Sequence, residues 1–281
     1  MPLDTPFIAA VLALTAATCW GAGDFIGGLA TRRSDAFRSV LISYSVGLVA
    51  LVIVALARAE TFPPPTDLVW GALAGLSGMI GVVFLFRGFA TGRMGIVAPV
   101  SAVLATAIPV IFNAFTDGLP DDLILVGFGI ALLGIWLLSR PERLGIRPVG
   151  LGMAVIAGLG FGSFFIALSQ VGENAVFWPL VAGRVAACAV MVAFALATQR
   201  PLLLLQTPLG LLTLTGVLDV AGNLFFLLAI QNGRLDIAAV LGSLYPAVTA
   251  ILARLAIKEY LTRLQMVGVG MAMLAIVLIT H

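Results

Sequence analysis

Ten long apolar stretches, separated by short connectors, dominate this 281-residue sequence. A helix of about 20 apolar residues crosses the ~30 Å hydrocarbon core of a bilayer, and each stretch reaches about that length. The stretches are continuously apolar and do not alternate, which excludes a transmembrane β-barrel. We therefore predict an all-α polytopic membrane protein with ten transmembrane helices, over residues 7–30, 37–57, 67–90, 94–116, 121–139, 148–170, 175–198, 207–232, 236–256 and 262–280.

The composition supports this fold class. Hydrophobic residues make up 61% of the chain and charged residues only 10%, whereas soluble domains average about 25% charged residues. This apolar composition excludes a soluble enzyme and a disordered protein. A nucleic-acid binder is also excluded, because a net charge of +2 steers little toward nucleic acid. The expected partners are the lipid bilayer and a small-molecule substrate.

The basic residues predict an orientation. The first of them, Arg32, follows the first apolar stretch, so that stretch lacks the basic n-region of a signal peptide and we expect it to remain in the protein. Lys and Arg gather in cytoplasmic connectors. With both termini outside, in the inner membrane of a bacterial-type cell, the outer connectors hold only Arg58 and Arg234. The cytoplasmic connectors then hold Arg32, Arg33, Arg38, Arg87, Arg93, Arg140, Arg143, Arg147, Arg200, Arg254, Lys258 and Arg263.

The chain repeats itself after 141 residues. At this shift Gly81 falls on Gly222, and the pair Gly92-Arg93 falls on Gly233-Arg234, all in one register without a gap. Each half holds five predicted helices, an odd number, so the second half must enter the membrane in the opposite sense. We predict two inverted five-helix repeats, residues 7–140 and 148–281, an arrangement typical of secondary transporters that work by alternating access.

Three segments resemble the EamA-type members of the drug/metabolite transporter superfamily, over essentially the whole chain as two EamA-like modules. Residues 19–25 (Cys-Trp-Gly-Ala-Gly-Asp-Phe) resemble the Trp-Gly start of the family's first helix. Residues 243–254 look like its ninth-helix motif, and residues 258–265 look like its Gly-Glu-Arg-Leu-Thr turn. The first half departs from this pattern, since Gly118 stands at the position equivalent to Glu259.

The resemblance implies export or exchange of small organic solutes. Substrates across the family include amino acids, nucleotide precursors, sugars and drugs, so the fold does not name the substrate. Family members more usually have cytoplasmic termini, whereas the charge count for this chain favours termini outside. We expect an exporter of a small organic metabolite, such as an amino acid or a related amine or drug.

Ionisable groups inside a bilayer are costly and therefore mark functional candidates. Asp219 lies near the middle of the eighth span, with Asn223 four residues on and thus on the same helix face. A carboxylate there could bind an amine or carry a proton. Arg184, in the seventh span, could pair with Asp219 or Asp24, or could hold a substrate carboxylate. A purely structural ion pair is the alternative.

Further candidates come from the first, fourth and ninth spans. Asp24 comes late in the first span, and Trp20 precedes it by one turn, where the indole ring could stack on a solute. The predicted substrate-binding set is Trp20, Asp24, Arg184, Asp219, Asn223 and Tyr245. Proline frees a backbone carbonyl and permits a bend, so the predicted hinges are Pro99, Pro109 and Pro246.

Two alternatives come from other classes. Residues 21–24 (Gly-Ala-Gly-Asp) match the Gly-x-Gly-Asp motif of intramembrane aspartyl proteases, with Asp219 as the second carboxylate. A scaffold without transport activity is the other. We nevertheless predict no enzyme, because a catalytic role does not explain the internal repeat. The chain lacks a P-loop and His/Cys clusters, so we also predict no ATP-driven transport, no cofactor and no metal. Proton coupling stays open, and ten helices allow a monomer or a homodimer.

Overall fold

The computed structural model describes residues 5–31, 34–90, 94–116, 118–138, 151–199, 207–257 and 263–279, apart from some side chains within the helices. These residues are helical except in the connectors, and they contain no strand. The helices are α1 (Thr5–Thr31), α2 (Ala36–Ala57), α3 (Pro65–Ala90), α4 (Met94–Thr116), α5 (Asp122–Leu138), α6 (Leu151–Ser169), α7 (Phe177–Ala197), α8 (Leu209–Gln231), α9 (Leu235–Gly242), α10 (Tyr245–Ile257) and α11 (Arg263–Ile279).

The all-α prediction is confirmed, with one refinement in the ninth span. Nine predicted spans match one helix each, and the ninth is divided into α9 and α10 by a break at Ser243 and Leu244. Pro246, as the second residue of α10, leaves no internal hydrogen bond unmade there, because the first turn of a helix has no partner for its N–H groups. Six of the described helices are long and apolar enough to cross a membrane, and three shorter apolar ones accompany them.

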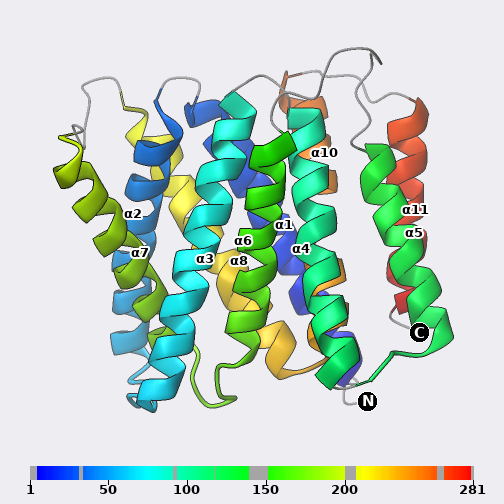
Figure 1. Cartoon of the computed structure of the whole chain (residues 1–281), viewed down its shortest axis with the longest axis horizontal. Helices are drawn as coiled ribbons and strands as arrows, with labels where there is room; N and C mark the ends of the chain where they lie inside the picture. Colours follow the sequence, from blue (N-terminus) through cyan, green and yellow to red (C-terminus); the bar gives the residue numbers. More distant parts are fainter. Residues whose placement is uncertain are drawn as a thin grey trace.

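The two halves are inverted relative to one another (Figure 1). In the view shown, α1 starts at the lower end of the bundle, whereas α6 runs downward and connects to α7 at that same end. We call this end the terminal face, because α1 begins and α11 ends there. It carries the connectors 58–64, 118–121, 170–176 and 232–234, and the other end is called the opposite face.

Equivalent helices make equivalent contacts. α1 packs against α8, and α6, the counterpart of α1, packs against α3. In the same way, α6 packs against α4, and α1 packs against α9 and α10, which together are the counterpart of α4. The helices α5 and α11 pack against each other at one edge of the bundle (Figure 1). This exchange of partners is what a pseudo-two-fold axis between two repeats requires.

Single residues follow the same symmetry. Trp20 and Phe161 are 141 residues apart, and so are Gly222 and Gly81. A Cβ atom on Gly222 would lie 2.5 Å from the Trp20 indole, and one on Gly81 would lie 2.5 Å from the Phe161 ring. Each aromatic side chain therefore occupies the space that a glycine of the other half leaves open.

Glycine also sets two close helix crossings. A Cβ atom on Gly75 of α3 would collide with the backbone of Gly183 in α7, and one on its counterpart Gly216 of α8 would collide with the backbone of Ser43 in α2. Small residues at such crossings let transmembrane helices approach closely. Large apolar side chains such as Ile53, Leu56 and Leu255 are instead exposed on the outside of the bundle, as expected for a multi-pass membrane protein.

Candidate substrate site

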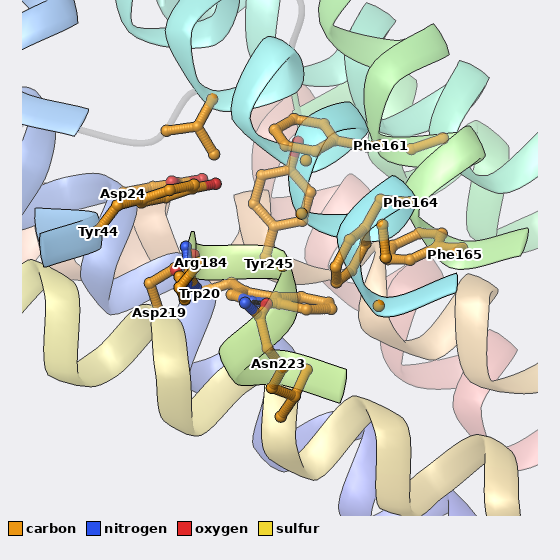
Figure 2. A pocket seen from close by; sticks show the side chains of 18 residues that line it. Trp20, Asp24, Tyr44, Phe161, Phe164, Phe165, Arg184, Asp219, Asn223 and Tyr245 are labelled. Carbon is orange, nitrogen blue, oxygen red and sulfur yellow. Dashed lines mark hydrogen bonds and ion pairs between the residues drawn. The ribbon is translucent and has the colours of Figure 1, made fainter. Parts of the chain in front are cut away.

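A cavity lies between the two halves, with an atom-free space of about 700 Å³ including its open part. All six residues of the predicted substrate-binding set line it (Figure 2). The full lining consists of Trp20, Asp24, Tyr44, Gly71, Ala74, Gly75, Gly78, Val82, Ala105, Phe161, Phe164, Phe165, Leu180, Gly183, Arg184, Asp219, Asn223 and Tyr245.

An ion pair between α7 and α8 forms one part of the wall. The guanidinium of Arg184 donates to the carboxylate of Asp219. The same guanidinium lies over the ring of Tyr44, 3.9 Å from its centroid, at the distance of a cation–π contact. Arg184 is 4% exposed, and a buried cation of this kind needs its partners to offset its desolvation. Asp219 is therefore engaged by Arg184 in this state.

The opposite part of the wall is aromatic. Figure 2 shows Phe161, Phe164 and Phe165 of α6 on the side of the cavity away from the ion pair. The Trp20 indole stacks on Phe165 with centroids 5.8 Å apart. Its Nε1 also donates to Oδ1 of Asn223 at 3.0 Å, which fixes the ring between the charged and the aromatic parts. These three phenylalanines are not part of the predicted substrate-binding set.

Asp24 differs from the other charged residues of the cavity. Within the part of the chain that the structure describes, its carboxyl group has no hydrogen-bond or ion-pair partner. It lines the cavity together with Tyr44, Asp219 and Tyr245. The hydroxyl of Tyr245 lies 3.3 Å from Oγ of Ser101 in α4, a contact that joins α10 to the first half.

The predicted hinges lie in α4 and α10. Pro109 is buried within α4, and Pro246 is in the first turn of α10 beside the break in the ninth span. Pro99 also lies within α4, but its side chain is outside the described residues. Near the break, Thr249 Oγ1 donates to the Gly21 carbonyl at 2.9 Å, so α10 is joined to α1 by a hydrogen bond. Hinge motion at these prolines stays a prediction.

Sequence analysis missed a group of contacts on the terminal face, which we call the clasp: Glu60, Asp67 and Gln231 bonded to residues 172–178. The Glu60 carboxylate accepts hydrogen bonds from the backbone N–H groups of Val176, Phe177 and Trp178, at 2.7–3.1 Å. Carboxylates at helix N-termini are favourable because they satisfy these groups and interact with the helix dipole. Glu60 belongs to the first half and α7 to the second, so the clasp joins the halves.

The other members of the clasp hold the same connector. Asp67 Oδ1 accepts from the Gly172 N–H at 3.2 Å. Gln231 of α8 donates to the carbonyls of Gly172 and Ala175 at 3.1 and 3.0 Å. Nothing in the local sequence around Glu60 signals this role, since it depends on where the α6–α7 connector lies in space.

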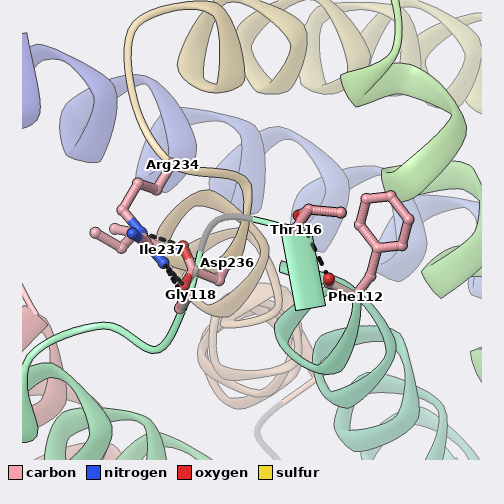
Figure 3. Close-up of polar contacts among 6 residues, drawn as sticks. All are labelled: Phe112, Thr116, Gly118, Arg234, Asp236 and Ile237. Atoms are coloured by element: carbon pink, nitrogen blue, oxygen red, sulfur yellow. Dashed lines mark hydrogen bonds and ion pairs between the residues drawn. The ribbon is translucent and has the colours of Figure 1, made fainter. Parts of the chain in front are cut away.

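A further contact between the halves lies on the same face (Figure 3). Arg234 binds Asp236 through two hydrogen bonds of 3.1 and 3.0 Å and also donates to the Gly118 carbonyl at 3.1 Å. Asp236 is fully buried, and a buried carboxylate of this kind needs such a partner. The α4–α5 connector is thereby tied to the start of α9.

Comparisons with known proteins agree with the fold. A family model described as the EamA-like transporter family matches residues 7–140 and again residues 148–281. An uncharacterized protein of Methanocaldococcus jannaschii is 29% identical over 130 residues, which cover 46% of this chain and 93% of that protein. A solved structure entitled only "Crystal structure of protein" covers 96% of this chain and 95% of its own, with a TM-score of 0.74 at 18% identity.

Proposed function

The chain belongs to the EamA-like transporter family, and from that membership we propose that it is a secondary active exporter of a small organic metabolite. A membrane transporter of the drug/metabolite type follows from the family itself. The substrate, the direction and the mechanism are our proposal. The observation that carries it is the cavity between the two halves, which has charged groups on one side and aromatic rings on the other.

Alternating access is the mechanism that the symmetry favours. Two inverted repeats can exchange conformations, which opens the central cavity first to one face and then to the other. The clasp and the Arg234 contacts join the halves on the terminal face. They support an assignment of this structure to a state closed on that face. With termini outside in an inner membrane, as the distribution of Lys and Arg favours, this state would face the cytoplasm.

Proton coupling is the energy source we propose. A carboxyl group inside a membrane is stable when a proton or a bound cation compensates its charge. Asp24 lies in the cavity and has neither an ion-pair nor a hydrogen-bond partner among the described residues, so it is better placed for this exchange than Asp219. The Arg184–Asp219 ion pair occupies the carboxylate on which sequence analysis had centred recognition.

The protease alternative is not favoured. Aspartyl proteases need two carboxylates that share a proton. Asp219 does not form such a pair with Asp24, because its carboxylate is bound to the Arg184 guanidinium. The family is one of transporters, which is consistent with the absence of enzymatic activity that we predict.

A tolerance panel tests the proposal. A sensitive bacterial host expressing the wild-type chain is challenged with toxic amino acids, amino-acid analogues, nucleosides and cationic drugs, alongside the Asp24→Asn variant at matched expression. We expect tolerance to one class that the variant loses. Equal sensitivity of the wild-type and vector-only hosts to every class, at good expression, would contradict export.

A further inference from the structure

The charges that line the cavity do not cancel. Three of its lining residues are carboxylic acids or strong bases: Asp24, Arg184 and Asp219. Arg184 and Asp219 neutralise one another through their ion pair. The remaining group is the Asp24 carboxyl, so the lining described here carries one excess negative charge whenever Asp24 is ionised.

No guanidinium or ammonium group in this lining is available for a carboxylate ligand. The Arg184 side chain is bound to Asp219 on one side and stacked on the Tyr44 ring on another. A carboxylate that entered the cavity would compete with Asp219 for Arg184 and would also meet the like charge of Asp24. Both effects oppose its binding, because an unpaired anion in a site poor in water is costly.

The rest of the lining suits an apolar group. The rings of Phe161, Phe164 and Phe165 face the cavity from α6, with the Trp20 indole between them and the charged residues (Figure 2). Aromatic faces attract cations as well as apolar surfaces. A ligand with an ammonium group at one end and a ring or alkyl group at the other would therefore match the cavity at both ends.

We infer that the substrate of this cavity is a small organic monocation with an aromatic or aliphatic portion and no carboxylate, and that Asp24 is the residue that selects its positive charge. This inference rests on the proposed function and narrows it, since it favours amines over amino acids. Four charged or hydroxyl-bearing side chains from other helices share the lining with Asp24. They are Tyr44 from α2, Arg184 from α7, Asp219 from α8 and Tyr245 from α10.

Repeat symmetry explains why one side chain can set the selectivity. The position equivalent to Asp24 in the second half is Phe165, and the position equivalent to Asp219 is Gly78. The two halves therefore supply different chemistry to one cavity. A ligand then meets a polar side and an apolar side, and only one orientation places its cationic group beside Asp24.

Equilibrium binding to the purified full chain in nanodiscs tests the inference with three phenyl compounds that differ in charge. The labelled probe is trimethyl(2-phenylethyl)ammonium, a cation that cannot lose its charge. The competitors are phenylalanine, a zwitterion, and 3-phenylpropanoate, an anion. We expect saturable binding of the probe and at least about tenfold weaker competition by both carboxylates, the range of a charge-assisted contact.

The variants separate charge from shape. Asp24→Asn should weaken probe binding at least about tenfold, and Asp24→Glu should retain most of it. Cys19→Ser, in the same helix but outside the cavity lining, should bind as the wild type does. Because the competition order is measured on the wild-type chain, the inference stays testable even if Asp24→Asn fails to fold.

Each outcome decides between the inference and the proposed function. Tighter binding of phenylalanine or 3-phenylpropanoate than of the cation would overturn the inference, and so would unchanged probe binding by Asp24→Asn. Absence of probe binding together with tolerance to another compound class would also overturn the inference and leave the export function standing. Absence of binding together with an entirely negative tolerance panel would contradict the export function as well.

Discussion

The Glu60→Gln substitution should shift this protein toward a state that is open on the terminal face. Glu60 is the first-half residue of the clasp that binds the start of α7. Its two carboxylate oxygens accept hydrogen bonds from three consecutive backbone N–H groups there. Glutamine keeps one acceptor oxygen but places an NH₂ group opposite the Trp178 N–H. The variant therefore leaves the Trp178 N–H without its charged acceptor and the Phe177 N–H with only one of its two acceptor oxygens. It also loses the favourable interaction of a negative charge with the N-terminus of α7.

The magnitude follows from the bonds that are lost. A hydrogen bond to a charged group contributes about 1.5–3 kcal/mol, so we assign about 2 kcal/mol to the substitution. The clasp joins the two halves, and the proposed alternating access requires it to separate when the terminal face opens. If the loss falls entirely on the closed state, the ratio of closed to open molecules decreases about 30-fold, since 1.4 kcal/mol corresponds to a factor of ten.

Cysteine accessibility measures this shift. The native Cys19 and Cys188 are first replaced by alanine, and Ala74→Cys then introduces one thiol in the cavity lining. A membrane-impermeant maleimide is added from each side of the membrane in turn. Labelling from the terminal face should become up to about 30-fold faster in the Glu60→Gln background.

Glu173→Gln is the matched control. Glu173 lies in the same α6–α7 connector, is exposed, and has no hydrogen-bond partner among the described residues. Its labelling rate should equal that of the parent. Equal rates for Glu60→Gln and the parent, with both proteins folded, would refute the view that the clasp holds the terminal face closed.

Two further substitutions test the packing and the ion pair of the cavity. Gly222→Ala should lower the free energy of unfolding in detergent by about 1–3 kcal/mol, because its Cβ would lie 2.5 Å from the Trp20 ring. Gly270→Ala is the control: the space around its Cβ is open to 4 Å, so its thermal unfolding temperature should be unchanged or higher. Asp219→Asn should lower the yield of monodisperse protein, because removal of one partner of a buried ion pair costs about 3–5 kcal/mol. Adding Arg184→Met to the Asp219→Asn chain should restore part of that yield. A fully stable Asp219→Asn single variant would show that the ion pair does not support the fold.

Much of the fold was predictable from the sequence because transmembrane helices are set by local composition. The runs of apolar residues define where helices must form, since every backbone polar group in lipid needs an internal partner. The 141-residue repeat then constrains how the two halves are arranged. The break at Ser243 and Leu244 was less accessible, because the equivalent stretch of the first half lies within an unbroken α4.

The residues of the cavity were predictable for the same physical reason. Asp24, Arg184 and Asp219 are costly inside a bilayer, which singles them out as candidates that converge on one place. Which carboxylate pairs with Arg184 was not predictable, because both Asp24 and Asp219 were possible partners until the helix packing was known. The structure pairs Arg184 with Asp219, which is why we propose the recognition role for Asp24.

The contacts of the clasp were not predictable from the sequence. Glu60 and Asp67 lie near a run of three prolines and resemble ordinary polar connector residues. Their role arises only from the approach of the α6–α7 connector, more than 100 residues later in the chain. Contacts of this kind depend on tertiary structure and leave no periodicity or motif in the sequence.

Counterflow in proteoliposomes tests the central claim most directly, namely that the cavity carries an organic cation across the membrane by alternating access. Vesicles loaded with unlabelled trimethyl(2-phenylethyl)ammonium are diluted into a trace of the labelled compound. A carrier that reorients with its substrate bound should accumulate label faster and to a higher level than vesicles without internal cation, and Asp24→Asn should abolish the difference. Label uptake equal to that of protein-free vesicles, or uptake that internal cation does not accelerate, would contradict the account.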